Sequence, residues 1–324
     1  MKKLIALTLT LLLSAALVFA AGSKEAAGPA TYKIGVSKLL THPAMDSIAK
    51  GISDYLATTD LSYTIREENA NGDISTCASI AALFKEEKVD VAVGIATPTA
   101  QAIYNALPTT YQVYSSVTDP VSAGLTDSEY VCGVSDMVPV ASHLELIERI
   151  TGAKTVGMVY TSSEANGITL MEAFKAACEE KGVSLVTVAV SNSAEVRVAA
   201  QSIIDRVDAM YVATDNTVVS AITALSDVCM SKKVPLFSAD TTSSFDTEVL
   251  LAGGFDYYKS GLLTGELIEK VLKGTAPSEI GINYLDVKSL ELYVNLDVAE
   301  KLGLTIPEDV IESAAYVIKD GKQN

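Results

Sequence analysis

Polar side chains follow five apolar runs, where each run gives way to Thr or Ser and then to Pro, Asp, Glu or Asn. The segments are 93–100 (VGIATPTA), 115–125 (SSVTDPVSAGL), 159–167 (VYTSSEANG), 212–221 (VATDNTVVSA) and 236–244 (LFSADTTSS). Side chains there can bind a polar small molecule, because a helix that begins at such a point presents unpaired N–H groups. The alternative is ordinary helix capping, for which Thr97, Ser163 and Asp215 are suitable residues.

The residue types in these segments indicate the charge of a ligand. They include Asp119, Glu164, Asp215 and Asp240. The segments contain no Lys or Arg, and none of them forms a glycine-rich phosphate loop. Carboxylates clustered in a cleft repel one another and lose solvation. A cationic group beside them offsets this cost in free energy. Helix N-termini and threonine hydroxyls could hold a single ligand carboxylate. We therefore expect an amino acid or a similar amphoteric molecule, with no cofactor and no metal.

An exported α/β enzyme is the weaker interpretation. G-x-S-x-G is absent, and neither of the two histidines has the sequence context of a general base. His42, in THPAMD (41–46), begins the first predicted helix and would face the cleft or the hinge. His143 lies on an amphipathic helical segment (142–150), where we expect a structural role.

The segments that must position these groups alternate between strand and helix. Continuous apolar runs, typical of parallel strands covered on both faces, predict strands: Tyr32–Ser37, Ser62–Glu67, Val89–Ile95, Gln112–Ser115, a short run around Cys132, Lys154–Tyr160, Ser184–Val190, Ala209–Ala213, Val234–Ser238 and Val249–Gly253. Helices are predicted at Pro43–Thr58, Asp73–Glu87 and Glu164–Lys181; the second starts from an Asp cap at Asp73 and the last ends at Gly182. The pattern occurs twice with a break near 135–139, which indicates α/β lobes with doubly wound parallel sheets.

The C-terminal part of the chain predicts a hinge. A long helix, Phe255–Lys273, precedes two extended runs, Ile280–Leu285 and Leu290–Val294. A chain that returns to the first lobe and crosses back would connect the lobes three times. We expect residues 31–136 with 256–286 to form lobe 1, and residues 137–255 with 287–324 to form lobe 2.

The N-terminus predicts export. Two lysines after Met1 precede the apolar run Leu4–Phe19, and small residues favour cleavage between Ala20 and Ala21. We expect a signal peptide at 1–20 and a small-residue tether at 21–30. The alternative is an uncleaved anchor, for which the run is short, since a span needs about 20 residues. No cysteine for lipid attachment lies near the cut, so we expect a protein of the periplasm or of the extracytoplasmic face of the cell membrane.

The composition limits the classes of molecule that this protein can bind. The 324 residues are 49% apolar and carry a net charge of −16, which disfavours nucleic acid. The four cysteines are scattered, and we expect them to be buried and unpaired. Cys178–Cys229 is the one pairing that merits a test.

Several motifs together resemble a known family. They are HPAMD (42–46), NANGDIS (69–75), IATPTAQA (95–102), VTDPVSAGL (117–125), GVSD (133–136), SSEANG (162–167), TDNTVVSA (214–221) and GFDYYKSGLLTGELIEKVLKGTAP (254–277). With these motifs in this order, the chain resembles the ABC transporter substrate-binding proteins with the type I periplasmic-binding-protein fold. Within that family it resembles the branch that includes tryptophan/tyrosine-type aromatic amino acid binders.

The resemblance implies a monomer whose two lobes close on a ligand around a three-stranded hinge, and delivery of that ligand to a membrane permease driven by an ATPase. It implies ligand contacts by Thr97, Thr99, Thr118, Asp119, Ser163, Glu164, Asn166, Asp215, Asn216 and Asp240, with His42 near the cleft mouth. Relatives commonly carry Gln in place of Lys38, Glu in place of Thr41 and Ser in place of Gly167. A ligand sensor that signals to a membrane receptor would share these features.

Overall fold

The computed structural model describes residues 31–126 and 128–323, so the signal peptide and tether predicted for residues 1–30 lie outside the described residues. The first sheet is six-stranded and parallel throughout, in the order β11-β5-β4-β3-β1-β2. Its strands are β1 (Tyr32–Lys38), β2 (Tyr63–Asn69), β3 (Val91–Ile95), β4 (Tyr111–Ser115), β5 (Val131–Ser135) and β11 (Ile282–Tyr284).

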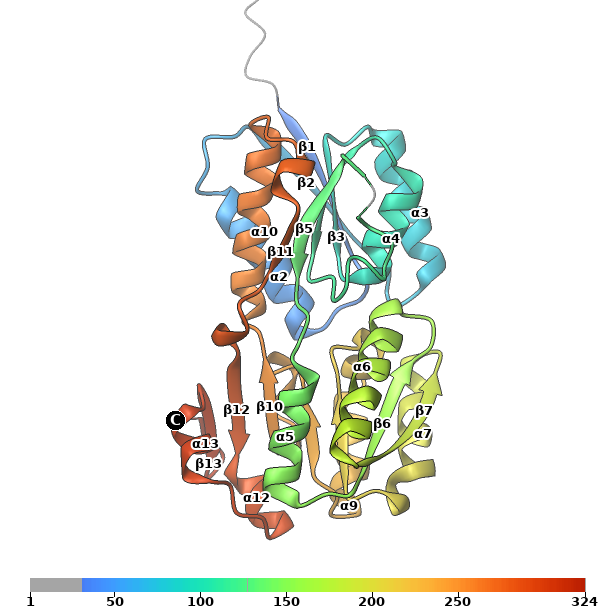
Figure 1. The fold of residues 1–324 in the computed structure, drawn as a ribbon. Helices are drawn as coiled ribbons and strands as arrows, with labels where there is room; N and C mark the ends of the chain where they lie inside the picture. The colour runs from blue at the N-terminus through green and yellow to red at the C-terminus, as the bar shows by residue number, and fades with distance from the viewer. Residues whose placement is uncertain (1–30, 127, 324) are drawn as a thin grey trace, which may run out of the picture. The chain divides into compact units, whose positions relative to one another are not determined.

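Helices cover both faces of this sheet. They are α2 (Pro43–Leu56), α3 (Ile74–Glu87), α4 (Thr97–Ala106), α10 (Tyr257–Leu272) and the short α11 (Pro277–Ile280). Figure 1 shows α2 and α10 on one face and α3 and α4 on the other. Every residue of β3 is buried, which explains its uninterrupted apolar sequence. Asp73 caps α3 by accepting a hydrogen bond from the backbone N–H of Ser75 (2.7 Å), as the sequence predicts.

The second sheet has eight strands in the order β14-β13-β12-β10-β9-β8-β6-β7. They are β6 (Thr155–Thr161), β7 (Ser184–Val190), β8 (Ala209–Val212), β9 (Leu236–Ser238), β10 (Leu251–Gly254), β12 (Glu291–Asn295), β13 (Tyr316–Lys319) and β14 (Lys322–Gln323). Its helices are α5 (Val140–Thr151), α6 (Ala165–Lys181), α7 (Val196–Ile203), α8 (Asn216–Ser220), α9 (Ile222–Ser231), α12 (Leu296–Leu302) and α13 (Glu308–Ser313). Short 3₁₀ turns are η1 (Ser193–Glu195), η2 (Ile204–Arg206), η3 (Thr242–Ser244) and η4 (Val287–Ser289).

The second sheet is not parallel throughout. β12 pairs with β10 in the antiparallel sense, and β14 pairs with β13 in the same way. β12 runs against β10 because the chain leaves β10 toward the first sheet and enters β12 on its return from it. The prediction of parallel sheets therefore holds from β7 to β10 and fails at this edge.

The chain passes between the sheets three times. The crossings lie between β5 and α5, between β10 and α10, and between β11 and β12 (Figure 1). The predicted fold class, two α/β lobes joined by a three-stranded hinge, is confirmed. The boundaries of the lobes stay a proposal. No helix among the described residues is both long and apolar enough to cross a bilayer.

The cysteines are buried and free, as predicted. Cys178 on α6 packs in one apolar cluster of the second sheet, and Cys229 on α9 packs in another. The Cys178–Cys229 pairing considered from the sequence is therefore wrong. Burial also raises the pKa of both thiols.

The contact between α2 and α10 depends on glycine. A Cβ at Gly51 would lie 2.4 Å from the carbonyl oxygen of Tyr258, and one at Gly261 would lie 2.3 Å from that of Ile48. The two backbones touch here, so Gly51→Ala has to push the helices apart. We expect the free energy of unfolding in urea to fall by about 2 kcal/mol.

The neighbouring exposed Lys50 provides the control, since Lys50→Ala should change the free energy of unfolding by less than about 0.5 kcal/mol. Equal stability of Gly51→Ala and the wild type would contradict the backbone contact.

Candidate ligand-binding site

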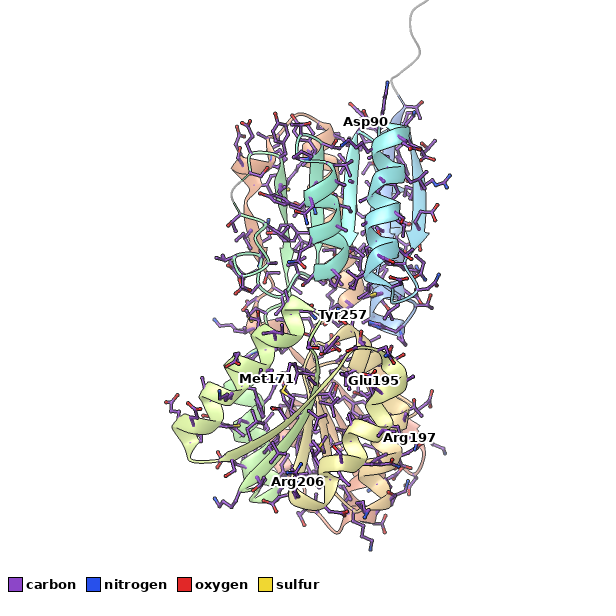
Figure 2. The ribbon with its side chains drawn as sticks, turned by 90° about the vertical axis from the view of Figure 1, so that its right-hand side faces the viewer. Asp90, Met171, Glu195, Arg197, Arg206 and Tyr257 are labelled. Carbon is purple, nitrogen blue, oxygen red and sulfur yellow. The ribbon has the colours of Figure 1, made fainter. Side chains whose placement is uncertain are left out.

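A cavity lies where the strands of both sheets end. Residues that follow β1, β3, β4 and β5 line it from the first sheet, and residues that follow β6, β8 and β9 line it from the second. Its volume is about 380 Å³, which includes space open to solvent. Tyr257, at the start of α10, lines the cavity and lies at the level between the two sheets (Figure 2).

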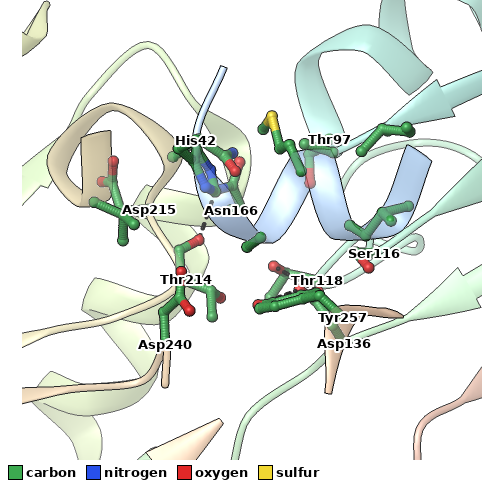
Figure 3. Close-up of a pocket in the computed structure, with 17 residues that line it drawn as sticks. His42, Thr97, Ser116, Thr118, Asp136, Asn166, Thr214, Asp215, Asp240 and Tyr257 are labelled. Carbon is green, nitrogen blue, oxygen red and sulfur yellow. Dashed lines mark hydrogen bonds between the residues drawn. The ribbon is translucent and has the colours of Figure 1, made fainter. Parts of the chain in front are cut away.

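The structure brings most of the predicted site residues together. The predicted residues on the cavity wall are His42, Thr97, Thr118, Asn166, Asp215, Asn216 and Asp240 (Figure 3). The remaining lining residues were not predicted from the sequence: Ala44, Met45, Ile48, Ile95, Ala96, Ser116, Asp136, Thr214, Val219 and Tyr257. Ala44, Met45 and Ile48 come from the first turns of α2 and give the cavity an apolar wall opposite its polar groups.

Four predicted residues do not line the cavity. The Thr99 hydroxyl hydrogen-bonds to the carbonyl oxygens of Ile95 (2.6 Å) and Ala96 (2.9 Å). Ser163 is exposed at the surface, and Glu164 is buried behind the wall. Ordinary capping of their own helices does not explain these positions either, because Thr99 lies inside α4 and Glu164, the N-cap residue of α6, makes no capping hydrogen bond with its side chain.

Asp119 is the fourth. Its carboxylate accepts hydrogen bonds from the backbone N–H groups of Val121 (3.0 Å) and Ser122 (3.2 Å), which fixes a local turn.

Two carboxylates face one another across part of the cavity. Asp136 directly follows β5 and accepts hydrogen bonds from the hydroxyls of Thr118 (3.3 Å) and Tyr257 (3.2 Å). Complete burial raises the pKa of Asp136 to about 6, and the negative charge of Asp240 adds to the effect. Asp240 accepts hydrogen bonds from Ser243, through its N–H (3.1 Å) and its hydroxyl (2.8 Å). No Lys or Arg of the described chain lines the cavity to balance the two acids.

Asp215 has its oxygens occupied by protein donors. It accepts hydrogen bonds from the N–H (2.6 Å) and hydroxyl (2.7 Å) of Thr161 at the end of β6, and from the N–H of Val218 (3.1 Å) in α8. Burial and the nearby Glu164 raise the pKa of Asp215 to about 7. Although it is on the wall, Asp215 primarily anchors α8 to the sheet.

Glu164 works in the same way behind the wall. Its carboxylate accepts hydrogen bonds from the N–H (3.0 Å) and hydroxyl (2.6 Å) of Thr217, and from the side-chain amides of Asn216 (2.6 Å) and Asn166 (3.2 Å). It therefore orients two amides that do line the cavity.

Other polar atoms on the wall are buried without a hydrogen-bond partner among the described residues. They are both ring nitrogens of His42, the hydroxyls of Thr97 and Thr214, and the side-chain oxygen of Asn166. An unpartnered buried polar atom costs about 1–3 kcal/mol, so these groups indicate a ligand that supplies the missing partners.

The backbone is strained at two strand exits on the wall. Ala96 has φ 76° and ψ 160°, and Ser116 has φ 52°. Residues other than glycine adopt such torsions at a cost of about 1–3 kcal/mol, and they gather at ligand sites. The described residues contain no group of three or more His, Cys, Asp or Glu side chains arranged to hold a metal.

Comparison with known proteins gives a consistent set of relatives. Residues 33–318 match the family described as ABC transporter substrate binding protein. A tyrosine-binding protein of Clostridioides difficile is 34% identical over 283 residues, covering 84% of this chain and 81% of that protein.

Two solved structures differ in their ligand state. An ABC domain from Streptococcus pneumonia in complex with L-Trp is 34% identical, with a TM-score of 0.84 over 89% of this chain and 100% of that one. The ligand-free, open structure of a Clostridium difficile substrate-binding protein with adhesive properties is 31% identical. Its TM-score is 0.65 over 89% of this chain and 99% of that one.

Proposed function

Because the chain belongs to the ABC transporter substrate-binding protein family, we propose that it is the extracytoplasmic component of an ABC importer. It captures an amino acid, with an aromatic one such as L-tryptophan or L-tyrosine as the first candidate, and delivers it to a membrane permease driven by an ATPase. The main support is a cavity shared by both sheets, with paired carboxylates and no Lys or Arg among its described lining residues.

The charge of the cavity supports a ligand with an ammonium group. Asp136 and Asp240 are buried and close enough for the charge of one to raise the pKa of the other. An ammonium between them would supply the missing positive charge and donate hydrogen bonds to their free lone pairs. Asp119 and Asp215 are weaker candidates for this role, because backbone and hydroxyl donors already bind their oxygens.

Opening and closing of the lobes explains how such a ligand enters. Residues of both sheets line the cavity, and three chain segments cross between the sheets. The greater structural similarity to the L-Trp complex than to the ligand-free open relative supports a closed arrangement here. A ligand that contacts both sheets favours the closed form by its differential affinity for it.

Export is part of the proposal. Members of this family act outside the cytoplasm, and the predicted signal peptide at 1–20 would direct the chain there. Residues 21–30, the predicted tether, would then form the N-terminal segment of the mature protein.

A thermal-shift screen tests the ligand. Residues 21–324 are heated with each amino acid and, as controls, with adenosine and glucose. We expect L-tryptophan or L-tyrosine to raise the Tm, because a ligand that binds only the native state stabilises it. A Tm that responds to adenosine or glucose, but to no amino acid, would contradict the proposed substrate class.

A further inference from the structure

Lys38 differs from the other basic side chains that form ion pairs. Its side chain is 13% exposed, whereas every other ion-paired Lys or Arg among the described residues is at least 40% exposed. The ammonium nitrogen of Lys38 lies 2.7 Å from Oδ1 of Asp46 and 3.1 Å from Oε1 of Glu67. Water and salt screen exposed ion pairs, but they screen a shielded ammonium between two carboxylates less.

The three residues of this network lie on three different elements. Lys38 is the last residue of β1, Glu67 lies on β2, and Asp46 lies in the first turn of α2. β1 and β2 are already joined by the hydrogen bonds of their parallel ladder. α2 is not part of the sheet, and residues 39–42 connect it to β1. The ion pair between Lys38 and Asp46 therefore ties the first turn of α2 to the sheet.

The position of this first turn determines the shape of the cavity. Ala44, Met45 and Ile48 from the start of α2 form the apolar wall. Close backbone contact with α10 holds the middle of α2, at Gly51. At the start of the helix the N-cap side chain of His42 makes no capping hydrogen bond. The side chain of Lys38 supplies a restraint at the end of the helix that lines the cavity.

The ammonium group also acts on the electrostatics of the cavity wall. His42 is buried on this wall (Figure 3), and burial has the largest effect on its pKa, which it lowers. Three acids from different elements act against burial and raise that pKa: Asp240 after β9, Asp46 in α2 and Glu164 before α6. Because Lys38 pairs with Asp46, it offsets the charge of this acid and favours the neutral ring.

We propose that Lys38 is a positioning residue of the binding site, which fixes the first turn of α2, and with it the apolar wall, through its ion pair with Asp46. Lys38 does not line the cavity, so it acts without touching the ligand. Two carboxylates that share one ammonium repel each other once it is removed. Without Lys38, Asp46 and the first turn of α2 are pushed away from Glu67 and β2. The proposal rests on the proposed function and adds a residue to it.

The first test is calorimetric titration of residues 21–324 with L-tryptophan at pH 7.5. Lys38→Met keeps the length of the side chain and removes its charge, and we expect the affinity to fall by about 3- to 30-fold. Lys38→Arg keeps the charge and should stay within threefold of the wild type. Lys50→Met, at an exposed ion pair with Asp54 on the same helix, is the matched control and should bind as the wild type does.

A double-mutant cycle tests whether Lys38 acts through Asp46. Asp46→Asn should weaken L-tryptophan binding to a similar extent, and adding Lys38→Met should then cause less than a twofold further loss. The imidazole of His42 supplies a second readout by NMR, since the chain has only two histidines. Its titration should move to higher pH in Lys38→Met and to lower pH in Asp46→Asn. A loss of packing alone would move it in the same direction in both variants.

Unchanged affinity in Lys38→Met, even with a lower Tm, would show that the network only stabilises the fold and would overturn the proposal. Additive losses in the double variant, or a His42 titration that does not respond, would also overturn it. If Lys38→Met does not fold, Lys38→Gln and Asp46→Asn provide the same test. In each case the wild type still binds L-tryptophan and the proposed function stands. A wild type that binds no amino acid overturns the proposed function, and the His42 titration then still decides whether Lys38 acts through Asp46.

Discussion

Replacing Asp136 or Asp240 with asparagine should weaken the binding of L-tryptophan by about 30- to 5,000-fold. Each substitution keeps the size of the side chain and removes one negative charge from a buried site. The ligand ammonium then loses a charged partner in a place that water does not reach, and such losses cost about 2–5 kcal/mol. Asp136 is buried and, among the described residues, accepts two long hydrogen bonds from hydroxyls, so its carboxylate has capacity left for a ligand.

Calorimetric titration of each variant gives the affinity, and circular dichroism shows whether it is folded. Glu172→Gln, at an exposed acid on α6, serves as the charge control and should bind as the wild type does. Asp119→Asn should have little effect because that carboxylate lies outside the cavity. A change of less than threefold in both cavity variants would place the ammonium elsewhere.

The affinity for L-tryptophan should fall as the pH is lowered below about 6. Burial raises the pKa of Asp136 to about 6, so below that pH the carboxyl group is protonated and neutral in the free protein. The ligand ammonium favours the ionised form, and binding therefore releases this proton. Each pH unit below 6 should then weaken binding by up to about tenfold, with a plateau above pH 7.

Titrations at pH 5, 6 and 7.5, in buffers of different ionisation enthalpy, measure both the affinity and the number of protons released. Asp136→Asn removes the group and should flatten the profile. An affinity that is constant from pH 5 to pH 7.5 in the wild type would show that Asp136 does not bind the ammonium.

The raised pKa of Asp136 also affects the free energy of unfolding of the ligand-free protein. The free energy of unfolding changes with pH in the opposite direction to the affinity for the ligand. The folded, ligand-free protein holds the Asp136 proton more tightly than the unfolded chain does, since the ordinary pKa of an aspartate is about 3.9. Its contribution to the free energy of unfolding is therefore present at acidic pH and is lost as the pH rises through the interval from about 4 to 6. Asp215, with a pKa of about 7, acts in the same direction. The ligand-free protein gains stability from these groups at the acidic pH values where binding weakens.

The fold could be predicted because its strands are buried on both faces. Such strands are apolar without interruption, as β3 illustrates, and the helices between them carry ordinary start and stop signals such as Asp73 and Gly182. The direction of β12 could not be predicted in this way. An antiparallel strand next to β10 follows from where the chain re-enters the sheet, which is a property of the hinge and not of the residues in β12.

The site could be predicted only to the level of a strand exit. The rule that ligands bind beyond the carboxyl ends of strands located Thr97, Thr118 and Asp240. It could not separate Thr97 from Thr99, because the direction of each side chain depends on the first turn of the helix. Asp136 was missed although it directly follows β5, since that exit coincides with the break between the lobes. Tyr257 was missed because it joins the site only when the chain returns from the second sheet.

The three crossings between the sheets also determine the order in which the protein can fold. β5 is bordered by β11, whose residues lie about 150 positions later, and α10 covers the same sheet. A ribosome must therefore synthesise most of the second sheet before the first can be completed. Contacts so distant in sequence form slowly. The first sheet thus lacks its last strand until at least 284 of the 324 residues have been made.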